Sequence, residues 1–235
     1  MSTSELALRQ GLRDTRRALA RWRREPGPVV RGWFAGALGF AIALLAAVLV
    51  ISSLATPDPT PLFIPGVKVP VGFGDFLHVL ERNSLVLALH ALACVAGFIA
   101  GSSLPLQAAR MSGPRRWVHE RARPVAFAWV VGVTCFSLVT QAYVLGNQGA
   151  QIADQLALSP ATLMLTVAPH ALVELVAVFL PLAAWTRASR QRRWDELLAA
   201  TMATVAIAIP LLLVAAAWEV WIWPGLLVRA SPLFG

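Results

Sequence analysis

Apolar residues along the chain fall into five blocks separated by polar or proline-rich stretches. The blocks cover residues 33–54, 84–104, 125–145, 161–185 and 197–222. Each is close to the ~20 residues that a helix needs to cross the hydrocarbon core of a bilayer. The pattern predicts an all-α, polytopic membrane helix bundle of about five transmembrane helices, with no room for a separate soluble domain.

The first stretch, residues 4–24, predicts a basic amphipathic helix that precedes the first span and ends before Pro26. Leucines and Trp22 fall on one side, and arginines cover much of the rest. Such a helix suits the anionic surface of a bilayer. The alternative is a cytosolic arm that docks a partner. The basic residues are Arg9, Arg13, Arg16, Arg17, Arg21, Arg23 and Arg24.

The connections differ in character. Residues 55–80 are rich in proline yet apolar for a loop, so we expect them to fold back onto the ends of the helices. Asp75 to Arg82 predicts a short interfacial helix leading into the second span. Basic loops are expected at residues 105–123 and 187–196, and a short loop without Lys or Arg at 146–160. The domain plan is a cytoplasmic segment (1–32), a membrane domain (33–225) and a short extracytoplasmic tail (226–235).

Basic residues predict the orientation. Seventeen of the 20 Lys and Arg residues lie in the N-terminal segment and the two basic loops, and three lie on the other side. By the positive-inside rule this places the N-terminus in the cytoplasm and the C-terminus outside the cell (inner) membrane. The split needs an odd number of spans, which favours five. The net charge of +8 then reflects topology, and we expect no nucleic-acid partner.

Composition adds two expectations. Only 14% of the residues are charged, against about a quarter in a typical soluble domain. The two cysteines, Cys94 and Cys135, both fall inside apolar blocks without the spacing of metal ligands or a redox pair. We interpret both as packing residues that form no disulfide. The first apolar block begins far from the start, so it is expected to remain as an anchor.

Ionisable residues inside the apolar blocks are the candidate site, because they are costly in hydrocarbon and usually face the interior of a bundle. His170 and Glu174 lie one helical turn apart and are expected to share a proton. Pro169 leaves a carbonyl one turn earlier without its donor. Two interpretations stay open: a binding or proton-handling site, and a buried polar clamp between helices. A metal would need further ligands from His90 or Glu219, so no metal or cofactor is predicted.

Three further polar residues stand at the ends of spans. Asn83 and Asn147 are amides that can cap or join helices, and Glu219 is expected to reach the interface or bond within the bundle. Motifs of serine hydrolases, zinc proteases and phosphate-binding loops are lacking. We therefore predict a protein that is not an enzyme.

Four segments together resemble the stage II sporulation protein M family: LERNSLVLALHALACVAGF, AYVLGNQGAQIADQL, LTVAPHALVELVAVFLPLAA and LLLVAAAWEVWIWP. The resemblance covers residues 76–225. It places family positions on Asn83, Asn147, Pro169, His170, Glu174, Glu219 and Pro224. A split Asn147-Gln148-Gly149 and Ala171 in place of a glycine mark a divergent member.

The resemblance implies a role. The family's namesake is a multi-pass membrane scaffold that localises two peptidoglycan-degrading partners during engulfment in sporulating bacteria. The leading hypothesis is thus a non-enzymatic scaffold that assembles with envelope proteins, with homo-oligomers left open. A second hypothesis is a small permease or transporter component with a polar path at His170 and Glu174. An intramembrane hydrolase has little support.

Overall fold

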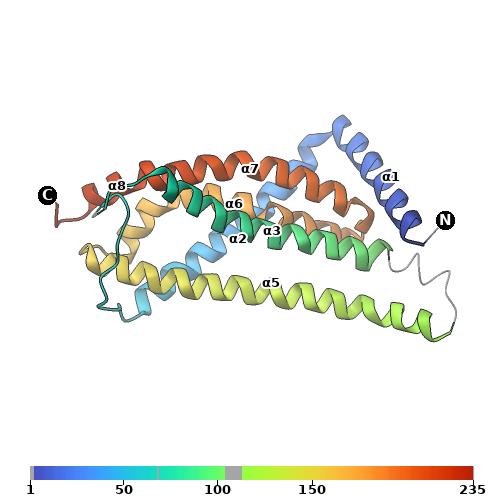
Figure 1. Cartoon of the computed structure of the whole chain (residues 1–235), viewed down its shortest axis with the longest axis horizontal. Coiled ribbons are helices and arrows are strands. Elements are labelled where there is room, and N and C mark those ends of the chain that lie inside the picture. The colour runs from blue at the N-terminus through green and yellow to red at the C-terminus, as the bar shows by residue number, and fades with distance from the viewer. Residues whose placement is uncertain (1–2, 68, 104–112, 235) are drawn as a thin grey trace. The chain divides into compact units, whose positions relative to one another are not determined.

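The computed structural model describes residues 3–67, 69–103 and 113–234. The fold is an all-α helical bundle, as predicted. Figure 1 shows the elements, which are α1 (Thr3–Arg24), α2 (Pro26–Leu54), α3 (Phe73–Phe98), the π-helix η1 (Ile99–Ser103), α5 (Pro114–Gln155), α6 (Pro160–Gln191), the 3₁₀ turn η2 (Trp194–Glu196), α7 (Leu197–Trp221) and α8 (Trp223–Ala230).

Five helices of the described part are long and apolar enough to span a membrane, which confirms the number predicted. They cover Pro26–Leu54, Phe73–Gly101, Phe127–Gln155, Pro160–Gln191 and Trp194–Trp221, each 28 to 32 residues long. These helices exceed the ~20 residues that the hydrocarbon core requires. The extra turns carry the spans beyond the apolar blocks into polar sequence at their ends.

The ends of the third span differ most from those predicted from the sequence. A loop was expected on each side of residues 125–145, but α5 runs unbroken from Pro114 to Gln155. The Asn147-Gln148-Gly149 segment therefore lies inside a helix. Asn147 Nδ2 donates a hydrogen bond to the carbonyl of Tyr143, 2.7 Å away and one turn earlier. Amides and small residues are compatible with a helix, and polarity alone did not end this one.

The chain divides into two compact units, each assembled from three segments. The first unit comprises Met1–Ala37, Val86–Cys135 and Val178–Ala208. The second comprises Leu38–Leu85, Phe136–Ala177 and Ile209–Gly235. Each unit thus contains parts of several spans.

Close helix packing holds the first unit together. A side-chain carbon added to Gly97 of α3 would lie 2.6 Å from Trp185 Nε1 and 2.9 Å from Leu197 Cδ1. Likewise, one added to Gly36 of α2 would lie 3.0 Å from the Cβ of Ala183. Small residues at these positions therefore let the helix backbones approach closely.

The cysteines behave differently from each other. Cys94 is fully buried, and its Sγ lies 3.1 Å from the Pro181 carbonyl oxygen in the first unit. Cys135 is exposed, so its interpretation as a packing residue was wrong for this chain. Both are free thiols, as expected. The apolar block around Cys135 belongs to α5, the span with the smallest buried share, where an outward position is the common one.

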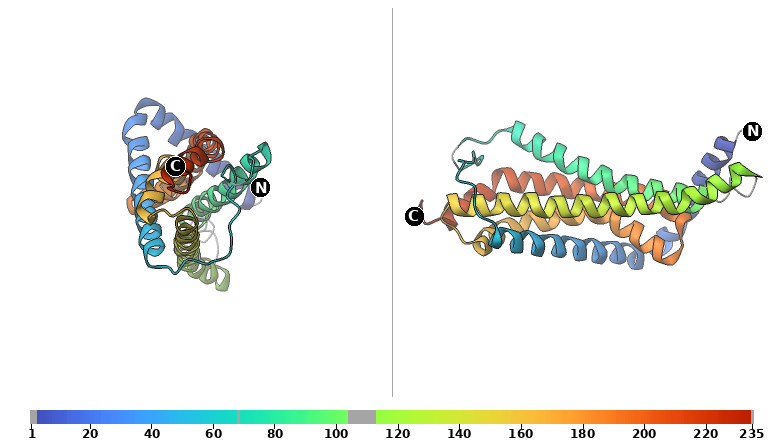
Figure 2. Two further views of the ribbon diagram at one scale, coloured as in Figure 1. Left: turned by 90° about the vertical axis from the view of Figure 1, so that its left-hand side faces the viewer. Right: turned by 90° about the horizontal axis from the view of Figure 1, so that it is seen from below.

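The loop between α2 and α3 packs against the helix ends of the second unit, as predicted (Figure 2). The amide of Gln155 is bidentate: Oε1 accepts from the Leu62 N–H at 2.9 Å, and Nε2 donates to the Thr60 carbonyl at 2.8 Å. Ile64 enters a core cluster whose other members are Ala153, Leu156, Leu163 and Leu227. The loop is thus fixed by backbone hydrogen bonds and by burial.

Thr60 also fixes the tip of the loop. Its backbone N–H donates to Asp58 Oδ1 at 2.9 Å. This contact and a second one from the Thr60 hydroxyl hold the pKa of Asp58 below its usual value. The last helix closes the same end of the unit, because Ser231 Oγ donates to the Leu156 carbonyl at 2.7 Å. Much of the predicted C-terminal tail is therefore helical and packed.

Candidate functional site: a polar junction between α3, α6 and α7

Helix α6 carries the most distinctive polar residues, and its start is well defined. Ser159 Oγ accepts a hydrogen bond from the Thr162 N–H at 3.0 Å, which is the arrangement of an N-cap. Pro160 occupies the first helical position, where its missing N–H costs nothing. The helix then continues through Pro169 and presents Thr166, His170 and Glu174 at successive turns.

Glu174 meets a second carboxyl group from another helix. Its side chain lies within electrostatic reach of Glu219 on α7 and of Asn83 and Arg82 on α3. Arg82 acts on Glu219 as well. Arg82, Asn83, Glu174 and Glu219 therefore form one group, here called the polar junction. It joins three helices of the second unit inside their membrane-spanning segments.

The charges of the polar junction partly balance. Two carboxyl groups repel one another when both are ionised, and the Arg82 guanidinium offsets part of that charge. Asn83 contributes an amide dipole to the same place, although its Nδ2 lacks a hydrogen-bond partner of ordinary geometry among the described residues. Ionisable groups inside a membrane usually pair in this way.

His170 pairs with an aromatic ring instead of with Glu174. Its imidazole lies 5.5 Å from the Trp223 ring, centroid to centroid, at an interplanar angle of 53°. Trp223 Nε1 also donates to Thr166 Oγ1 at 3.2 Å, one turn further back on α6. The expected proton-sharing pair of His170 and Glu174 is therefore not formed. Helical spacing placed the two residues on one face but could not show that each had a partner elsewhere.

The two contacts share one antiparallel register. Glu174 interacts with Glu219, and His170 interacts with Trp223. His170 precedes Glu174 by four residues, whereas Trp223 follows Glu219 by four, so the two segments run in opposite directions. We call the two levels rungs: the carboxyl groups of Glu174 and Glu219 interact electrostatically, and the rings of His170 and Trp223 are in contact. His170 and Glu174 lie one turn apart on one face of α6, whereas Glu219 lies in α7 and Trp223 begins α8, after a turn at Ile222.

Other predicted site residues lie elsewhere. His90 is fully buried in the first unit, 5.3 Å from the Phe179 ring. Its ring nitrogens have no hydrogen bond of ordinary geometry in the described part, although the backbone of Val86 and Val178 lies close enough to interact with them. Asn147 bonds to its own helix. Gly149, in contrast, has a packing role: a side-chain carbon there would lie 3.2 Å from Ser52 Oγ of α2. Within the described ranges, no group of three or more His, Cys, Asp or Glu side chains is placed to hold a metal.

Sequence reasoning missed Trp223 and Arg82 as members of the site. A signal for Trp223 was present, because Glu219-x-x-x-Trp223 repeats the four-residue spacing of His170-x-x-x-Glu174. The first spacing lies across the junction of α7 and α8, and the second lies within α6.

Helix α1, which carries the basic residues, is docked on the rest of the first unit. Trp22 stacks edge-on against Trp33 of α2, with ring centroids 5.1 Å apart. Arg21 forms an ion pair with the buried carboxylate of Glu196, which Arg193 approaches at 3.6 Å. Arg13, Arg16, Arg17, Arg23 and Arg24 are exposed. The side chain of Arg9 lies outside the described residues.

The five apolar spans define a multi-pass helical membrane protein. Residues 116–224 match the family model described as stage II sporulation protein M. This match supports the resemblance to the family over the matched residues. The matched range contains both rungs and ends at Pro224, while Asn83 precedes it. Comparison with curated proteins and with solved structures finds no match.

Proposed function

We infer that the protein is a non-enzymatic membrane scaffold that assembles with peptidoglycan-remodelling or other envelope proteins. One observation supports this inference: residues of the matched segment interact at two levels, Glu174 with Glu219 electrostatically and His170 with Trp223 through their rings. Their arrangement suits the clamp interpretation, in which ionisable groups brace helices against one another. A braced unit provides a rigid base for surfaces that bind partners.

The loop at residues 55–72 is the surface offered to a partner outside the cytoplasm. Its backbone is fixed by Gln151 and Gln155, which both donate to the Thr60 carbonyl. Phe63 nevertheless remains 83% exposed. A large aromatic side chain on an ordered loop is typical of an interface anchor, since little conformational entropy is lost when it binds.

The topology completes the proposal. Seventeen basic residues mark the cytoplasmic side, so the N-terminus lies in the cytoplasm and the loop at 55–72 faces outward. The membrane is the cell (inner) membrane. Reporter fusions at the two termini measure this directly, and a fluorescent signal from a cytoplasm-only reporter at the C-terminus would contradict it.

Co-purification tests the scaffold. The tagged full chain, extracted in mild detergent, is expected to retain a peptidoglycan hydrolase, identified by mass spectrometry. Phe63→Ser should reduce the retained hydrolase at least about tenfold, since an interface anchor is worth ~2 kcal/mol or more. Leu54→Ser, at a residue 80% exposed at the end of α2, is the matched control and should retain it. A wild-type chain that purifies with no envelope protein contradicts the proposal.

A transporter component is the second candidate, favoured by the carboxyl pair of Glu174 and Glu219 inside the spans. Transporters place such groups on ion or proton pathways. Proton flux into proteoliposomes containing the purified chain is the test. Flux that Glu174→Gln abolishes would support transport, and equal flux in wild-type and mutant vesicles removes this candidate.

A further inference from the structure

Helix α1 is docked through one stripe of its surface. Gly11, Thr15, Ala18 and Trp22 follow one another at helical spacing, and all four are buried. A side-chain carbon at Gly11 would lie 3.1 Å from Leu198 Cδ1 and 3.3 Å from Phe98 Cζ. Trp22 packs on Trp33. Phe98 and Leu198 lie near the ends of two apolar spans, which is the level expected for the bilayer headgroups.

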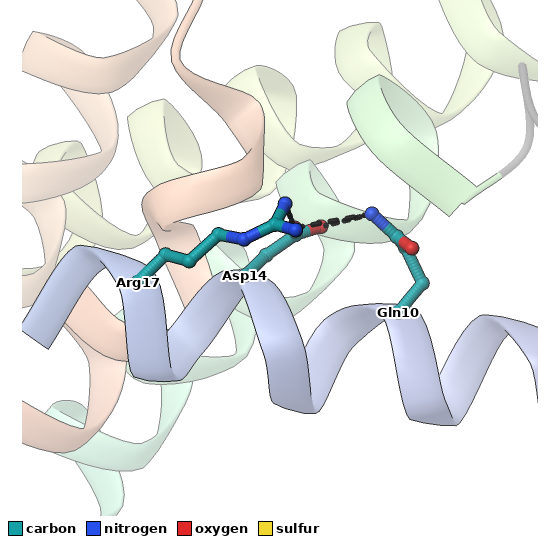
Figure 3. A network of polar contacts seen from close by, with 3 residues as sticks. All are labelled: Gln10, Asp14 and Arg17. Atoms are coloured by element: carbon teal, nitrogen blue, oxygen red, sulfur yellow. Dashed lines mark hydrogen bonds and ion pairs between the residues drawn. The ribbon is translucent and has the colours of Figure 1, made fainter.

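One flank of the docked stripe is polar and has partners within the protein. Gln10 Nε2 donates to both carboxylate oxygens of Asp14 at 3.1 Å, and Arg17 approaches Asp14 at 3.6 Å (Figure 3). Arg21 is held by Glu196. The polar groups of this flank therefore have partners within the flank or elsewhere in the first unit. The residues are Gln10, Asp14, Arg17 and Arg21.

The opposite flank alternates apolar and basic residues. Leu12, Arg16, Leu19 and Arg23 lie at the spacings of three and four residues that align side chains along a helix. Leu12 is 54% exposed, Leu19 is half-buried, and both arginines are exposed. Leucine and arginine thus share one accessible stripe, which we call the Leu/Arg stripe.

We propose that the Leu/Arg stripe is a binding site for anionic phospholipid. The guanidinium groups of Arg16 and Arg23 bind headgroup phosphates, and the leucines contact the first carbons of the acyl chains. Arginine suits phosphate because its donors form a planar fork. A ligand that is anionic at one end and apolar at the other matches both halves of the stripe. The bilayer around the spans supplies such a ligand at this level.

Lipid binding to the purified full chain in neutral detergent tests the proposal, with native mass spectrometry as the readout. Phosphatidylglycerol is expected to bind and phosphatidylcholine to bind far more weakly. Arg16→Gln with Arg23→Gln should weaken phosphatidylglycerol binding about thirtyfold, from the typical contribution of a basic residue at a membrane surface. Leu12→Gln should weaken it too, although no charge is lost.

Arg13→Gln with Arg24→Gln is the matched control, because it removes the same charge from exposed positions of the same helix outside the stripe. This control should weaken binding much less. Equal losses in the two double variants would overturn the stripe as a site and leave only general attraction. Displacement of phosphatidylglycerol by a polyglutamate peptide would identify an acidic protein as the occupant, and displacement by inorganic phosphate alone would show that the leucines contribute nothing. Either result overturns the proposal.

Discussion

Gly97→Val is expected to destabilise the protein by about 3 kcal/mol, because the added carbons have no space to occupy. The first of them would already lie 2.6 Å from Trp185 Nε1 and 2.8 Å from Trp185 Cδ1. That indole is itself held, since it stacks on Phe127 with ring centroids 5.4 Å apart. Helices α3 and α6 must therefore move apart. The free energy of unfolding in mixed detergent micelles measures the effect.

Gly132→Val is the matched control for this steric argument. Gly132 lies in another span, and a side-chain carbon there would meet nothing within 4 Å. Its free energy of unfolding should change by less than about 0.5 kcal/mol, as for most substitutions away from packed sites. Equal losses in the two variants would mean that helix propensity, and not the contact with Trp185, explains the result.

Trp223→Ala is expected to cost about 3 kcal/mol, near the lower end of the range for large aromatic residues. Trp223 contacts Thr166 and His170 of α6 and packs against the core cluster around Leu227. Its removal leaves the imidazole of His170 without its ring contact. The same unfolding measurement applies. The scaffold proposal adds a second expectation, that the retained hydrolase is lost together with stability.

Two further substitutions separate the contribution of the Trp223 ring from that of its N–H group and from that of a neighbouring indole. Trp223→Phe keeps a ring against His170 but removes the N–H that donates to Thr166, so it should cost about 1 kcal/mol. Trp221→Ala changes a neighbouring indole that is 51% exposed and should cost less than Trp223→Ala. A larger loss at Trp221 than at Trp223 would show that the His170–Trp223 rung contributes little to the packing of α8 on α6.

The number and class of the helices could be predicted from the sequence because hydrophobic length is a strong local signal. Helix ends were less accessible. The Asn147-Gln148-Gly149 segment has the composition of a loop, but a helix already stabilised over many turns continues through it. Likewise, the short helix expected at Asp75 to Arg82 is the first part of the continuous helix α3.

The sequence indicated the candidate residues of the site more readily than it indicated which of them contact one another. His170, Glu174, Glu219 and Asn83 were chosen because polar groups are costly in hydrocarbon, which is a property of each residue alone. Which of them contact one another depends on how α6 and α7 are aligned, and a single sequence does not contain that register. The error with His170 and Glu174 came from assuming that neighbours on one helix are partners.

The docking face of the N-terminal helix was likewise not predictable from the sequence pattern. Its amphipathic pattern predicted a helix with basic and apolar sides, and α1 has both. The pattern did not reveal that small residues, Gly11, Thr15 and Ala18, would form the docked stripe. Helix–helix contacts favour small side chains that allow close approach, whereas hydrophobic scales emphasise the large ones. The leucines expected in the interface therefore lie beside the docking face.

Cysteine crosslinking between α6 and the consecutive helices α7 and α8 tests the two-rung register most directly. In a Cys94→Ala, Cys135→Ala background, Glu174→Cys should crosslink with Glu219→Cys, and His170→Cys with Trp223→Cys. The mixed pairs, Glu174→Cys with Trp223→Cys and His170→Cys with Glu219→Cys, are displaced by one turn, about 5.4 Å, and should crosslink much more slowly. Faster crosslinking of the mixed pairs would contradict the register and, with it, the clamp on which the scaffold proposal rests.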